Sequence, residues 1–123
     1  MRYITDRKRA VGLGSAKTGA QEFWKVRLTS AGLFVLVPLF VFTFGPMLGE
    51  PHDEVIAYFA RPFPAIVAAL TIVVGFKHFR DGAQVMIEDY VHGTTETLAI
   101  IAVTIISYGA MATGLFAIAR IAL

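Results

Sequence analysis

The chain has 123 residues, of which 56% are hydrophobic and only 16% are charged, and its mean hydropathy is +0.66. A water-soluble domain of this size would have too little polar surface to cover such a core. The absence of cysteine excludes disulfides, thiolate metal sites and cysteine-ligated iron–sulfur clusters from this chain. The net charge of +2 comes mostly from basic residues beside apolar segments, which indicates a membrane-topology signal and no nucleic-acid binding.

The N-terminal residues 1–21 are polar and contain several glycines, which predicts a flexible cytoplasmic tail. An arm that orders against a soluble partner is the alternative. From residue 22 to residue 123 we predict a single three-helix transmembrane anchor in the lipid bilayer. Trp24 at its beginning suits the headgroup region, and Lys25 and Arg27 can reach lipid phosphates.

Three apolar segments are long enough to cross a hydrocarbon core about 30 Å thick. They cover residues 28–49, 63–89 and 97–119, and the first and third carry no charge. In the acidic connection before the second span, residues 53–60 could form a short surface helix. In the third span, Ala110 and Gly114 have the small-xxx-small spacing that permits close helix contact, and ordinary alanine-rich packing is an equally good interpretation. The sequence therefore predicts an all-α membrane protein.

The distribution of basic residues predicts the orientation of these spans. Seven Lys or Arg residues lie among residues 1–27, whereas the opposite side of the membrane receives only Arg61 and Arg120. By the positive-inside rule the N-terminus is cytoplasmic, so the second span ends at the cytoplasmic surface.

The second span carries a cluster of ionisable residues, and such clusters are costly in hydrocarbon unless they are paired or contact a cofactor. Lys77 and Asp81 are spaced to pair along the helix. Arg80 could instead meet a haem propionate if a partner helix brings it close. The cluster is the strongest candidate for a functional site in this chain.

His78 belongs to the same cluster and precedes Asp89 by eleven residues, which puts it about 16 Å deeper in the membrane. Gly82 follows it by one helical turn and leaves a flat gap beside the imidazole, where a porphyrin edge could pack while the ring nitrogen holds the iron. A hydrogen bond from His78 to a neighbouring helix is an equally good interpretation. At the helix end, Asp89 and Tyr90 fit an ordinary interfacial terminus, or a proton and hydrogen-bond source for a quinone.

These residues resemble the small hydrophobic D subunit of succinate dehydrogenase (complex II), especially its alphaproteobacterial and mitochondrial members. The resemblance rests on the run His78-x3-Gly82-x6-Asp89-Tyr90-Val91 near the end of the second span, and on Val26-Arg27-x-Thr29 at the start of the first. It covers the chain from about residue 15 onward.

The resemblance implies a non-catalytic anchor in a bacterial inner membrane, paired with a C-subunit anchor to hold a flavoprotein subunit and an iron–sulfur subunit. It also implies that His78 is one axial ligand of haem b, the other coming from the C subunit. Tyr90 would hydrogen-bond ubiquinone, with Asp89 beside it and Arg27 nearby. Lys77, Arg80 and the N-terminal tail have no counterpart in this pattern, so their roles stay open.

Two rival interpretations accompany this one. A fumarate reductase anchor would run the same chemistry in reverse, and the sequence does not set the direction. A small ion-transporter subunit would use Lys77 and Asp81 as a proton relay and would need no haem.

Overall fold

The computed structural model describes residues 5–7 and 16–123, so most of the predicted N-terminal tail lies outside the described residues. Every regular element of the described chain is a helix. Its elements are α2 (Ala16–Phe44), the 3-10 turn η1 (Gly45–Met47), α3 (His52–Phe59), α4 (Pro62–Tyr90) and α5 (Thr94–Ala122).

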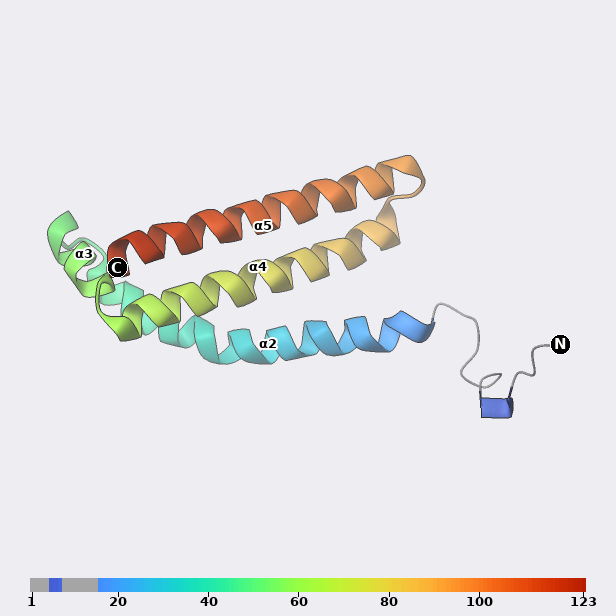
Figure 1. Ribbon diagram of the computed structural model, residues 1–123, viewed down its shortest axis with the longest axis horizontal. Helices are drawn as coiled ribbons and strands as arrows, with labels where there is room; N and C mark the ends of the chain where they lie inside the picture. The colour runs from blue at the N-terminus through green and yellow to red at the C-terminus, as the bar shows by residue number, and fades with distance from the viewer. Residues whose placement is uncertain (1–4, 8–15) are drawn as a thin grey trace.

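Three of these helices are long and apolar enough to cross a membrane, as the sequence predicted: residues 19–47, 62–90 and 94–122. Helix α4 packs against both α2 and α5 (Figure 1). The start of α2 and the turn between α4 and α5 lie at one end of the molecule, whereas α3 and the C-terminus lie at the other. Residues far apart in sequence are thereby gathered at the two ends.

Helix α2 begins at Ala16, inside the segment that the sequence assigned to the tail. The hydropathy of a sequence identifies only the residues that lie in the hydrocarbon core, whereas the helix itself can extend beyond that core. The short surface helix expected over residues 53–60 is confirmed by α3, and α4 starts at Pro62, where the missing backbone N–H costs nothing.

Small residues set the distances between the long helices. A Cβ atom built on Gly114 of α5 would lie 3.1 Å from Cδ1 of Ile72 on α4, so this glycine permits the close contact that its spacing predicted. On the other side of α4, a Cβ atom on Gly32 of α2 would lie 3.4 Å from Cγ1 of Val74. Close helix approach at small residues is the usual way that membrane helices associate.

The three long helices leave most of their apolar side chains uncovered. Only five hydrophobic residues are buried within the described chain: Phe59, Ala65, Val67, Ala68 and Ile87. Many Phe, Leu, Ile and Val side chains on all three helices are instead exposed. Surfaces of this kind are stable against lipid or against other membrane chains.

Candidate functional site

The ionisable cluster of α4 is built around Asp81, which is only 8% exposed. Its carboxylate accepts hydrogen bonds from Lys77 Nζ and, at 3.0 Å, from Arg80 Nη1. The pairing of Lys77 with Asp81 that the spacing predicted is thus confirmed. Arg80 also donates from Nε to the Thr104 hydroxyl of α5 at 3.3 Å, so it is engaged on the α5 side of the helix.

A small polar cavity of about 60 Å³ adjoins this cluster between α2 and α4. Its polar lining residues are Glu22, Lys25, Lys77, Arg80, Asp81 and Gln84. A cavity of this size has room for water. Asp81 therefore compensates part of the positive charge of Lys77 and Arg80, and the remaining charge faces a polar cavity.

His78 lies beside this cluster and is half-buried at the contact between α4 and α2. Its Nδ1 atom is 3.0 Å from the hydroxyl oxygen of Thr29 on α2. Among the residues that the structure describes, none hydrogen-bonds to Nε2. The interhelical hydrogen bond that the sequence allowed is present, and it uses only one of the two ring nitrogens.

Gly82 lies one turn beyond His78 and is exposed. A Cβ atom built on it would meet no atom within 4 Å, so the gap expected beside the imidazole is open space in this chain. Phe79, three residues earlier and on the same side of α4, is 56% exposed. A flat apolar group therefore has access to the helix surface next to His78.

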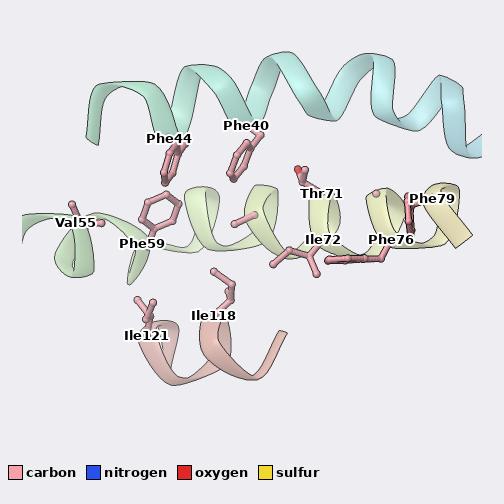
Figure 2. A pocket seen from close by; sticks show the side chains of 12 residues that line it. Phe40, Phe44, Val55, Phe59, Thr71, Ile72, Phe76, Phe79, Ile118 and Ile121 are labelled. Carbon is pink, nitrogen blue, oxygen red and sulfur yellow. The ribbon is translucent and has the colours of Figure 1, made fainter. Parts of the chain in front are cut away.

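An apolar groove of about 650 Å³ runs along α4 and reaches Phe79 (Figure 2). Its other labelled lining residues come from all four helices: Phe40 and Phe44 of α2, Val55 and Phe59 of α3, Thr71, Ile72 and Phe76 of α4, and Ile118 and Ile121 of α5. The Thr71 hydroxyl donates to the carbonyl of Val67 at 2.7 Å and so offers the groove no free donor. The lining suits an apolar occupant.

Tyr90 and Asp89 lie at the end of α4, where both side chains are exposed and Tyr90 reaches 82%. No other side chain of the described chain hydrogen-bonds to either of them. Arg27 is also exposed, and its guanidinium lies 4.5 Å above the ring of Phe23. At about 100° per residue Arg27 points away from Thr29 and hence from α4, so this chain does not bring it to Tyr90.

The donor set of this site is a single imidazole nitrogen. No group of three or more His, Cys, Asp or Glu side chains is placed to hold a metal ion in the described part of the chain. A metal bound only by protein ligands would need such a group, whereas a haem could be held by a single imidazole from this chain. A half-buried imidazole with one nitrogen unpaired among the described residues fits that requirement. The fold defines a multi-pass helical membrane protein.

The family model for the succinate dehydrogenase/fumarate reductase transmembrane subunit matches residues 1–116, and the chain belongs to this family. It is 43% identical to the succinate dehydrogenase hydrophobic membrane anchor subunit of Paracoccus denitrificans, over 100% of this chain and 95% of the relative. It is 27% identical to a succinate dehydrogenase membrane anchor subunit of Reclinomonas americana, over 74% of this chain and 79% of that relative. No solved structure matches it.

Within its family the chain is a succinate dehydrogenase membrane anchor, a non-catalytic subunit that crosses the inner membrane several times. The resemblance drawn from the His78 run is thereby confirmed at the level of the family. The transporter interpretation is not supported, because Lys77 and Asp81 are paired within an anchor of this family.

Thr29 is the residue whose contact the sequence did not reveal. It precedes His78 by 49 residues and lies on a different helix, so no local spacing connects the two. The only signal was its place in the Val26-Arg27-x-Thr29 segment.

Proposed function

We propose that His78 supplies one axial ligand of a b-type haem, and that a C-subunit anchor supplies the other. Gly82 leaves room for the porphyrin edge. When bound, the haem supplies reversible one-electron chemistry at iron. This chain holds the imidazole in place through the contact between α4 and α2.

The observation that carries the proposal is the environment of the two nitrogens of His78. Nδ1 is engaged by Thr29, and Nε2 has no partner among the described residues. The two nitrogens of an imidazole point in different directions, so Nε2 faces away from Thr29. Gly82, where a Cβ atom would meet only open space, and the exposed Phe79 are within about one helical turn of His78. A metal-bound histidine typically has this arrangement, with one nitrogen on the metal and the other hydrogen-bonded.

We also propose that Tyr90 donates a hydrogen bond to ubiquinone at the end of α4, with Asp89 as a nearby proton source. Both side chains are exposed and are not used by this chain, so they are available to a substrate. Arg27 belongs to the same end of the molecule and would reach the quinone head group across a face that other subunits cover. Its role is to raise the positive potential near the quinone head group, where negative charge develops on reduction.

The partners follow from the surfaces that this chain leaves open. The apolar groove along α4 suits a transmembrane helix of the C-subunit anchor, because its lining offers no free hydrogen-bond donor. The flavoprotein and iron–sulfur subunits would dock at the cytoplasmic end, where α2 begins and α4 ends (Figure 1). Electrons from succinate would then enter at the end of the bundle that holds the quinone. The fumarate reductase direction uses the same parts and belongs to the same family.

The test is the reduced-minus-oxidised optical spectrum of the purified complex carrying His78→Ala. The b-type absorbance should be lost or strongly shifted, because one iron–nitrogen bond has been removed. His92→Ala, which alters an exposed histidine in the turn after α4, is the matched control and should leave the spectrum unchanged. An unaltered spectrum in the His78→Ala complex would overturn the proposal.

A further inference from the structure

We infer that Thr29 is the positioning residue for His78: its hydroxyl oxygen accepts the Nδ1–H of the imidazole and fixes the tautomer whose Nε2 lone pair can bind iron. The inference rests on the proposed haem ligation and extends it to a second helix. The two atoms are 3.0 Å apart, which is an ordinary hydrogen-bond distance.

The direction of this hydrogen bond follows from counting protons. A threonine hydroxyl has one hydrogen to donate and two lone pairs with which to accept. The Thr29 oxygen lies 3.0 Å from the backbone carbonyl of Lys25 and 3.0 Å from that of Val26. A carbonyl can only accept, so the hydroxyl hydrogen goes to the backbone of α2. The oxygen then faces His78 as an acceptor, and Nδ1 carries the proton.

The tautomer has a direct consequence for metal binding. In a neutral imidazole only one nitrogen carries a proton, and the other keeps its lone pair. With the proton on Nδ1, the lone pair is on Nε2, the nitrogen without a partner in the described chain. Thr29 therefore selects the form of His78 that can ligate iron, before any iron is bound.

The packing between α2 and α4 holds this contact in register. Gly32 lies three residues after Thr29, and Val74 lies four residues before His78, so the Gly32–Val74 contact is about one turn away from the hydrogen bond. Thr29 is β-branched and is tied to its own helix, which restricts its rotation. These contacts thus fix the orientation of the His78 ring as well as its tautomer.

The hydrogen bond also affects the iron electronically. A partner on Nδ1–H increases the basicity of the ligating imidazole and favours the ferric state. Removal of the hydroxyl should therefore raise the haem midpoint potential and weaken haem retention. Loss of such a partner typically costs about 10–100-fold in metal affinity.

The experiment uses the intact complex purified with Thr29→Val, which keeps the shape of the side chain and removes the hydroxyl. Haem content per complex and the midpoint potential from an optical redox titration are the readouts, and neither depends on turnover. Ser30→Ala is the matched control, because Ser30 donates only to the Val26 carbonyl and is exposed. Thr29→Ser restores a hydroxyl and should restore both values.

We expect Thr29→Val to lower the haem content about tenfold when the complex is diluted, or to raise the midpoint potential of the haem. Ser30→Ala should resemble the unaltered complex in both readouts. Thr29→Ala is the second variant in case valine prevents assembly of the complex. It also removes the hydroxyl, leaves a smaller side chain, and should change the haem content and the midpoint potential in the same direction. Unchanged haem content and potential in these variants would overturn the inference. If His78→Ala loses the haem while the Thr29 variants are normal, only the role of Thr29 fails, and the proposed ligation stands.

Discussion

Replacement of Asp81 by asparagine is the perturbation for which the structure gives the clearest energetic expectation. Asp81 is 8% exposed and is the shared partner of Lys77 and Arg80, whose side chains are 34% and 26% exposed. Removal of one partner of a buried ion pair costs about 3–5 kcal/mol, because it leaves an uncompensated charge. Both cations are partly exposed, so we expect the lower end of this range. A cost of about 3 kcal/mol corresponds to more than a hundredfold change in the folding equilibrium.

The assay is the fraction of intact complex that survives a denaturant or temperature series in detergent. The double variant Lys77→Met/Asp81→Asn should recover part of the loss, since it removes one of the two stranded cations. Glu88→Gln is the matched control, because Glu88 accepts a hydrogen bond from Gln84 at the same spacing on an exposed part of α4. It should cost only a few tenths of a kcal/mol. If Asp81→Asn were as well tolerated as Glu88→Gln, Asp81 would not be the essential buried counter-ion of Lys77 and Arg80.

Three further predictions concern other parts of the chain. Gly114→Val should lower the thermal stability of the complex by about 1–3 kcal/mol, because its side chain would collide with Ile72, whereas Gly109→Ala should be harmless. Tyr90→Phe should slow quinone reduction several-fold while succinate oxidation by an artificial dye stays normal, since a lost hydrogen bond is worth about 0.5–1.5 kcal/mol. Reporter fusions should show the N-terminus in the cytoplasm and the C-terminus outside, as expected from the distribution of basic residues.

Each of these predictions has a contrary result. Equal stability of the Gly114 and Gly109 variants would mean that α4 and α5 are not in close contact at Ile72. Unaffected quinone reduction in Tyr90→Phe would return Tyr90 to the role of an ordinary interfacial residue. A C-terminal reporter that is active in the cytoplasm would reverse the orientation of all three spans.

The spans and the charged cluster could be predicted from the sequence because both depend on local properties. The apolar length that crosses a membrane is a property of consecutive residues, and so is the spacing that pairs Lys77 with Asp81. The small-xxx-small spacing in the third span likewise predicted a close contact, which the structure has at Gly114 and Ile72. That spacing did not predict which helix α5 contacts, because a pattern within one helix carries no information about the identity of its neighbour.

The contacts between helices could not be predicted in the same way. Arg80 bonds to Thr104 on α5, and His78 bonds to Thr29 on α2, and both contacts depend on how the helices rotate when they pack. The sequence offered a haem ligand or a helix contact as alternatives for His78. The structure provides the helix contact at one nitrogen and leaves the other nitrogen available, so the alternatives are compatible.

The most direct test of haem ligation by this chain is an experimental density map of the assembled complex. We predict a haem beside Gly82 with its iron bound to Nε2 of His78, a second axial ligand from the partner anchor, and Nδ1 within hydrogen-bond distance of Thr29. A haem whose two axial ligands both come from other chains, or a map without haem next to α4, would contradict it.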